Sequence, residues 1–172
     1  MRLFVAVPVP EDIRKKVSLL GNEIAQDGVT VVRPENMHLT LKFIGEVEEA
    51  DSIKKSLIGI KFRKFDCVVR RVGVFPNENY VKVVWAGIDG GSELDRLAAK
   101  IKENLIRYKD TEKFSAHLTI ARVKRKLDVG AFLAKHKQDE YGKFTATKFE
   151  LIQSILGSDG PKYITLATFS LE

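Results

Sequence analysis

The stretch MHLTLKFIG at residues 37–45 returns in a related form as AHLTIARV at residues 116–123. The chain of 172 residues contains only three histidines, and two of them, His38 and His117, each begin a His-Leu-Thr triplet. The triplets lie about half a chain apart, as corresponding positions of an internal repeat would. The repeat predicts two similar halves that bring the same short segment to one place.

The elements expected around each triplet occur in the same order. A β-rich run at residues 2–8 precedes a helix that begins after Pro10 and stops by Gly28, as its apolar residues at helical spacing indicate. A second β-rich run at residues 80–88 precedes a second striped helix at about residues 92–105. Each helix is followed by a His-Leu-Thr strand, a shorter helix and another β-rich run. The short helices are expected at about residues 49–58 and 128–138, and the β-rich runs at residues 65–75 and 144–155.

This repeated order predicts an α+β fold. We expect a single domain, residues 1–172, of two pseudo-symmetric lobes at about 1–79 and 80–172. Each lobe is expected to be a mostly antiparallel sheet with two helices, and the active-site cleft should lie between them. The segment KYITLATFSL is the last strand of the second lobe, and Ser92 with Asp95 resembles a capping box at the start of the second long helix.

Strand geometry places the polar residues of each triplet together. Alternate side chains of a strand share a face, so His38 and Thr40 point one way while Leu39 and Leu41 point the other. The same alternation holds for the second triplet. Each triplet therefore offers an imidazole and a hydroxyl side by side, backed by two aliphatic side chains.

Several common kinds of site are not indicated. A zinc site needs three or four ligands, and neither triplet has a second ligand at the usual spacing. The third histidine, His136, lies in the polar segment AKHKQDE and is expected to be solvated. The single cysteine, Cys67, lies in an apolar segment, which favours a small buried hydrophobe over a reactive thiol. We therefore expect no metal and no cofactor.

Composition narrows the class of protein only slightly. The net charge is +6 and the isoelectric point is near 9.4, an excess that attracts phosphates but does not by itself indicate a nucleic-acid partner. An apolar run of the length that spans a membrane is absent, and the first apolar run is followed at once by charge, as in a strand. We expect a cytoplasmic monomer with no membrane association.

Two imidazoles without a metal or a nucleophile suit in-line attack on phosphorus. One group takes a proton from the attacking oxygen while another gives a proton to the leaving oxygen on the opposite side. Histidine suits both roles because its reference pKa is about 6.5. Threonine hydroxyls can hydrogen-bond the non-bridging oxygens. A noncatalytic RNA- or nucleotide-binding module, in which the histidines only donate hydrogen bonds, is the alternative.

Over its whole length the sequence resembles the two-histidine phosphoesterases, and within them the RNA 2′,3′-cyclic phosphodiesterases, also called 2′-5′ RNA ligases. The resemblance rests on segments spread along the chain: RLFVAVPVP, MHLTLKFIGEV, VGVFPN leading into VVWAGI, FSAHLTIARV and GPKYITLATFSL. Where the family commonly has proline before the second histidine, this chain has Ala116.

The resemblance implies a site and a reaction. The active site would consist of His38, Thr40, His117 and Thr119, with His117 as the base that activates water and His38 as the acid that protonates the departing 3′ oxygen. The substrate would be RNA with a 2′,3′-cyclic phosphate end, for example a tRNA fragment, and the product a 2′-phosphate. A 5′-hydroxyl in place of water would give reversible 2′-5′ ligation. A phosphodiesterase for another small cyclic phosphate is the enzymatic alternative.

Two cations are candidates for phosphate contact. Lys42 shares strand parity with His38 and Thr40, so it should reach the same cleft. Arg122 follows the second triplet where the family often has arginine, but by parity it would face away from His117 unless the strand bulges near Ala121. Without such a bulge it is a surface arginine. The basic run that follows, at residues 124–126, could track an RNA backbone or form a solvated loop.

Overall fold

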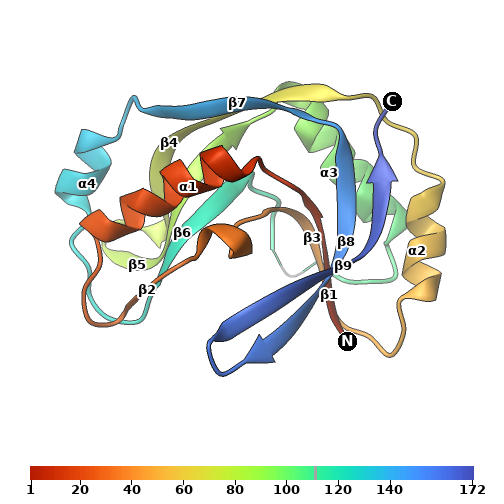
Figure 1. Cartoon of the computed structure of the whole chain (residues 1–172), viewed down its shortest axis with the longest axis horizontal. Helices are drawn as coiled ribbons and strands as arrows, with labels where there is room; N and C mark the ends of the chain where they lie inside the picture. The colour runs from red at the N-terminus through yellow and green to blue at the C-terminus, as the bar shows by residue number, and fades with distance from the viewer. Residues whose placement is uncertain (111) are drawn as a thin grey trace.

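Two antiparallel sheets form the frame of the molecule in the computed structural model, which describes residues 1–110 and 112–172 (Figure 1). The strands are β1 Arg2–Val7, β2 Val29–Val31, β3 Leu39–Glu46, β4 Phe65–Asn77, β5 Tyr80–Asp89, β6 His117–Val123, β7 Glu140–Ala146, β8 Lys148–Gly157 and β9 Gly160–Ser170. The helices are α1 Glu11–Leu20, α2 Asp51–Ile58, α3 Gly91–Asn104 and α4 Gly130–Lys135, with 3₁₀ turns at Gly21–Glu23 and Pro34–Asn36. The predicted α+β class is confirmed.

The two sheets do not follow the predicted division of the chain at residues 79 and 80. The first sheet has the order β3-β1-β8-β9 and the second the order β2-β6-β5-β4-β7, so each takes strands from both halves of the sequence. The β-rich run predicted at 144–155 is split at Thr147 into β7 and β8, which belong to different sheets. Sequence pattern marks a strand but not its partner, because every strand offers the same backbone hydrogen-bonding groups.

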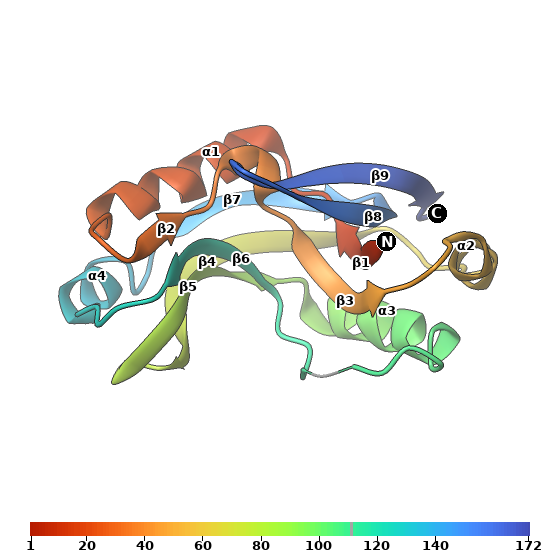
Figure 2. The same ribbon diagram turned by 90° about the horizontal axis from the view of Figure 1, so that it is seen from below.

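The repeated order of elements nevertheless appears in the pairing. β1 pairs with β3 as β5 pairs with β6, so each triplet lies on a strand beside the first strand of its half. The helix that follows β1, α1, packs on β6 and β7 of the second sheet, whereas α3, which follows β5, packs on β3 of the first. The two long helices lie on opposite sides of the molecule (Figure 2). The long helix of each half thus packs on strands from the other half, and the halves interlock into one unit.

Both long helices bury the apolar faces that their spacing predicts. In α1 these are Ile13, Val17 and Leu20, and in α3 they are Leu94, Leu97, Ala98 and Ile101. The predicted capping box is wrong, since no side chain caps α3 and the Asp89 carboxylate instead accepts a hydrogen bond from the Gly91 N–H at 3.0 Å. None of the helices in the described part of the chain is long and apolar enough to cross a membrane.

The first helix ends earlier than its pattern suggests. α1 stops at Leu20, and the 3₁₀ turn that follows carries the chain to Ile24, the last apolar residue of the predicted stripe. Gly21 lies at this change because a Cβ there would come within 2.3 Å of the Val31 side chain in β2. The α-helix thus ends where β2 approaches it closely, although the apolar pattern continues to Ile24.

Cys67 lies in β4 with no exposed surface, as its apolar segment predicts. Burial raises the pKa of its thiol to about 12. The thiol is therefore protonated at neutral pH, and the side chain acts as a small hydrophobe in the core.

Candidate active site

The structure brings the strands of the two triplets together. His38 lies just before β3, His117 is the first residue of β6, and β3 contacts β6 although they belong to different sheets. Both histidines, Thr40 and Thr119 are half-buried, whereas the alternate residues Leu39, Leu41, Leu118 and Ile120 are buried in the core. The alternation predicted for both triplets is confirmed.

A β-bulge after the first triplet removes Lys42 from the site. Thr40 lies opposite Ala6 of β1 and Lys42 lies opposite Val5, so that Leu41 is the extra residue. A bulge of this kind changes which face the following side chains take. Lys42 is 3% exposed, and its Nζ donates to the Tyr108 carbonyl at 2.8 Å and pairs with the Asp110 carboxylate. The prediction that Lys42 contacts phosphate is wrong, because the bulge breaks the parity on which it rested.

The same bulge after the second triplet turns Arg122 to the side of the strand that carries His117. Thr119 lies opposite Trp85 and Ala121 opposite Val84, so that Ile120 is the extra residue. This is the irregularity on which a role for Arg122 depended. Arg122 is exposed whereas Ala121 and Val123 are buried, so beyond the bulge it lies on the same side of the strand as His117 and Thr119.

His117 is held by its backbone and by two aromatic rings. Its Nδ1 lies 2.7 Å from the Ser115 carbonyl oxygen. Because a carbonyl only accepts, Nδ1 carries the hydrogen of this bond, which leaves Nε2 of the neutral ring free to accept a proton. The Phe75 ring meets the imidazole edge-on at 5.2 Å between centroids, and the Trp85 ring lies at 6.4 Å.

His38 has a comparable setting on the first sheet. Tyr163 of β9 meets the imidazole edge-on at 5.0 Å between centroids, and Phe4 of β1 does so at 5.9 Å. The Nδ1 atom is buried and has no hydrogen-bond partner among the described residues. Each histidine is thus packed between two aromatic side chains of its own sheet.

Sequence reasoning missed these four aromatic residues. They come from β1, β4, β5 and β9, whereas parity relates only residues of a single strand. All four lie in segments that carry the family resemblance, namely RLFVAVPVP, VGVFPN, VVWAGI and GPKYITLATFSL, and that was the available signal. Those segments do not reveal which strands pair, and it is strand pairing that brings the four rings to the two histidines.

The surroundings of both imidazoles favour the neutral form of the ring. Burial is the largest cause that lowers the pKa of His38 and of His117 below the usual value. The Ser115 carbonyl, which is hydrogen-bonded to His117 Nδ1, opposes this by favouring the charged ring. The Asn36 carbonyl acts on His38 in the same direction but forms no well-aligned hydrogen bond with its ring. Arg122 adds to the lowering of the His117 pKa. It also lowers the pKa of the Tyr163 hydroxyl, against the larger effect of burial, which raises it.

Comparison with known proteins places this geometry in a family. The family model described as LigT like Phosphoesterase matches residues 7–85. An RNA 2′,3′-cyclic phosphodiesterase of Archaeoglobus fulgidus is 41% identical, with 98% of this chain and 99% of that protein covered. This chain belongs to the LigT-like phosphoesterase family. An RNA 2′,3′-cyclic phosphodiesterase of Methanocaldococcus jannaschii is 32% identical, with 95% and 96% covered. The family resemblance of the sequence is confirmed.

Solved structures agree on the fold of this LigT-like phosphoesterase. A protein of Thermus thermophilus superimposes with a TM-score of 0.82 at 26% identity, with 99% of this chain and 98% of that chain covered. LigT of E. coli, solved in complex with 3′-AMP, gives a TM-score of 0.80 at 23% identity, with 99% and 97% covered. The two sheets and their helices are therefore those of the LigT fold.

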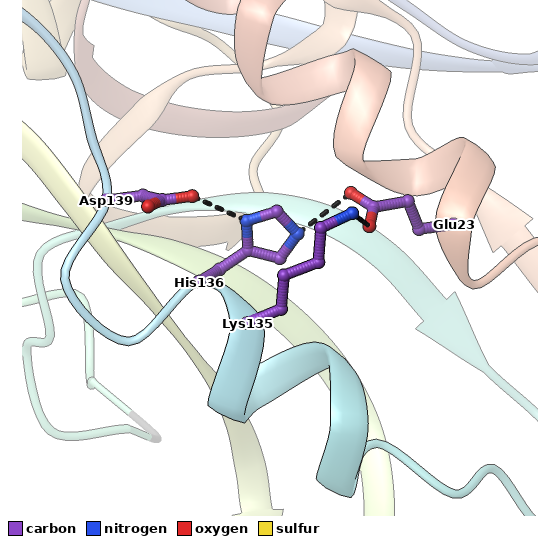
Figure 3. A network of polar contacts seen from close by, with 4 residues as sticks. All are labelled: Glu23, Lys135, His136 and Asp139. Atoms are coloured by element: carbon purple, nitrogen blue, oxygen red, sulfur yellow. Dashed lines mark hydrogen bonds and ion pairs between the residues drawn. The ribbon is translucent and has the colours of Figure 1, made fainter.

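The third histidine lies outside the site and is not solvated as predicted. His136 is 5% exposed, and its Nδ1 lies 2.7 Å from the Asp139 carboxylate while its Nε2 lies 2.8 Å from that of Glu23 (Figure 3). Glu23 also accepts a hydrogen bond from Lys135 at 2.6 Å. These contacts tie the end of α4 to the 3₁₀ turn after α1. The local sequence is polar, but Glu23 comes from the other half of the chain, so local pattern does not indicate the burial.

Few of the described residues could bind a metal ion or the phosphate backbone of an RNA. Among residues 1–110 and 112–172, no group of three or more His, Cys, Asp or Glu side chains is arranged to hold a metal ion. In the basic run at 124–126, Arg125 pairs with Asp27, while the side chains of Lys124 and Lys126 are exposed. Lys124 directly follows the strand of the second triplet, and Lys126 comes two residues later.

Proposed function

We propose that this phosphoesterase hydrolyses RNA 2′,3′-cyclic phosphate ends to 2′-phosphates by metal-independent acid–base catalysis. The observation that carries the proposal is the duplicated site, in which His38 lies just before β3 and His117 begins β6, two strands of different sheets that contact each other. Each histidine has a threonine two residues on and a bulge at the next position. The names of the two archaeal relatives, both RNA 2′,3′-cyclic phosphodiesterases, support the choice of substrate.

The proposed reaction needs one neutral and one charged imidazole. His117 accepts a proton from water through Nε2, the water oxygen attacks phosphorus, and the bond from phosphorus to the 3′ oxygen breaks. His38, initially charged, gives its proton to that oxygen. The hydrogen bond of His117 Nδ1 to the Ser115 carbonyl supports the assignment of His117 as base. Proton exchange with solvent then restores both rings.

The hydroxyls and Arg122 stabilise the negative charge of the five-coordinate phosphorus. Thr40 and Thr119 can donate hydrogen bonds to its non-bridging oxygens, and the guanidinium supplies charge-assisted ones. If a 5′-hydroxyl of another RNA attacks instead of water, the same steps produce a 2′-5′ linkage. The exposed Lys124 and Lys126 beside the strand suit the backbone of an RNA such as a tRNA fragment.

The pH profile of hydrolysis follows from the lowered pKa of both histidines. The reactive form carries one proton on the pair, so kcat/KM is bell-shaped and its maximum lies between the two apparent pKa values of the pair. Because burial lowers the pKa of both rings, we expect that maximum below about pH 6.5, the reference value for imidazole. Initial rates at low substrate, followed from acidic to alkaline pH, measure it. A maximum on the alkaline side of neutrality would contradict the surroundings described for the two rings.

Chelation tests the proposed chemistry. The protein is dialysed against EDTA and incubated with a dinucleotide ending in a 2′,3′-cyclic phosphate, with a DNA dinucleotide ending in a 3′-phosphate as control. We expect unchanged hydrolysis of the RNA end and no reaction of the DNA, which lacks the 2′ oxygen. Loss of activity that one divalent ion restores would contradict the metal-free mechanism. Folded protein that releases no product from any cyclic phosphate would favour a noncatalytic binding module.

A further inference from the structure

The first histidine lies just beyond the end of its hydrogen-bonded ladder. The last pair between β1 and β3 joins Val7 to Leu39, so His38 is the next residue outward. Pro8, which would lie opposite His38 if the pairing continued, has no N–H group to donate. The ladder between the two strands therefore does not fix the position of His38.

The second histidine, in contrast, lies inside its ladder. His117 is paired with Gly87 of β5. One residue further out, the Ile88 N–H still donates to the Ala116 carbonyl at 3.0 Å. The two halves thus differ in how the backbone of the histidine is held, although their triplets are alike.

Arg14 of α1 joins the two chain segments that separate where the first ladder ends. Its Nε donates to the Val9 carbonyl at 2.9 Å, two residues after β1. Its Nη1 donates to the Pro34 carbonyl at 2.7 Å, in the 3₁₀ turn that precedes His38. Because the guanidinium is a rigid fork and the side chain is half-buried, these two hydrogen bonds fix the spacing of the two carbonyls.

We propose that Arg14 is the positioning residue of the acid, His38, which makes the inference rest on the proposed function. The turn that Arg14 holds ends at Asn36, two residues before His38, so it sets where the chain enters the site. The acid must lie in line with the leaving 3′ oxygen, and a displacement of about 1 Å can lower the rate by about 10²-fold. Arg14 acts through this turn and not by contact with the substrate.

The charge of Arg14 has a second effect on the imidazole. Burial is the largest cause that lowers the pKa of His38, the Arg14 cation lowers it further, and Glu150 of β8 raises it. Tyr163 of β9 packs against the ring, and burial raises the pKa of its hydroxyl, so it adds no charge at neutral pH. A lower pKa makes the imidazolium a stronger acid toward the leaving oxygen.

Two substitutions separate the hydrogen bonds from the charge. Arg14→Met removes both, whereas Arg14→Lys keeps the charge on a compact ammonium that does not bridge the two carbonyls. In both variants we expect kcat on a cyclic-phosphate dinucleotide to fall by about 10- to 100-fold with KM nearly unchanged, because the substrate contacts remain. The titration midpoint of the His38 ring, followed by NMR, should move to higher pH in Arg14→Met and stay near the native value in Arg14→Lys.

Hydrogen exchange gives a readout that needs no turnover. The Met37 N–H donates to the Pro34 carbonyl at 3.2 Å within the held turn, so it should exchange faster in both Arg14 variants. The Ile88 N–H, beside the second histidine, should keep its native rate. Lys16→Met removes an exposed cation from the same helix and serves as the matched control, which should equal the native protein in every measurement.

Thermal unfolding shows that each variant is folded at the temperature of the assays. Native kcat in either folded Arg14 variant, an unchanged exchange rate of the Met37 N–H in both, or an equal loss of kcat in Lys16→Met would overturn the inference. A native protein that hydrolyses no cyclic phosphate would instead reject the proposed function. Hydrogen exchange and the His38 titration would then still decide whether Arg14 holds the turn.

Discussion

Replacing His38 or His117 by alanine is expected to lower kcat on a cyclic-phosphate dinucleotide by about 10²–10⁴, the usual contribution of a positioned acid or base. The double variant should be scarcely slower than either single one, because the two rings act as a unit and either loss already removes the concerted transfer. Single-turnover rates on folded protein measure the effect. Near-normal turnover by either folded single variant would rule out the two-histidine scheme.

His136→Ala is the matched control for these variants. It removes the remaining histidine, which lies outside the site and binds Glu23 and Asp139. The folded variant should keep the native turnover. Its thermal unfolding midpoint should fall, because two carboxylates lose their shared partner and α4 loses its tie to the turn after α1.

Lys42→Ala is expected to destabilise the protein by about 2–4 kcal/mol. Removing one partner of a buried ion pair typically costs about 3–5 kcal/mol, because the other charge is left without compensation. The expected loss of stability is smaller here because the Asp110 side chain is 18% exposed and keeps an ion pair with Lys102 at 3.2 Å. Urea unfolding measures the difference.

Lys42→Met separates this structural role from phosphate binding. Methionine keeps most of the volume of the buried stem, so the loss of stability should be smaller than for alanine. In both Lys42→Ala and Lys42→Met, the salt dependence of KM should match that of the native protein, because Lys42 does not reach the site. A KM that rises and loses part of its salt dependence in Lys42→Met would restore Lys42 to the phosphate site.

The fold class and the two triplets could be predicted from sequence because they depend on local patterns. Alternation within MHLTLKFIG and AHLTIARV fixes which side chains share a face over three or four residues, and helical spacing marks α1 and α3. The partner of each strand could not be predicted. The continuous β-rich run that divides at Thr147 between two sheets has no local mark of that division.

The same limit explains the unequal outcome for the two cations. By strand parity, Lys42 was expected to face the site and Arg122 to face away from it. One bulge after each triplet reverses the face that the following side chains take, so both residues lie on the opposite face from the one expected. A bulge is a property of the ladder between two strands, so a single strand's sequence does not reveal it. Family resemblance favoured Arg122 where parity did not, and the bulge turns Arg122 to the same side of β6 as His117.

The position of the phosphate in the product tests the central claim most directly. A dinucleotide ending in a 2′,3′-cyclic phosphate is incubated with the native protein in EDTA, and the product is assigned by ³¹P NMR. If His117 activates water and His38 protonates the departing 3′ oxygen, the product carries a 2′-phosphate alone. A 3′-phosphate, or a mixture of the two, would show that the leaving oxygen is not the one assigned to His38.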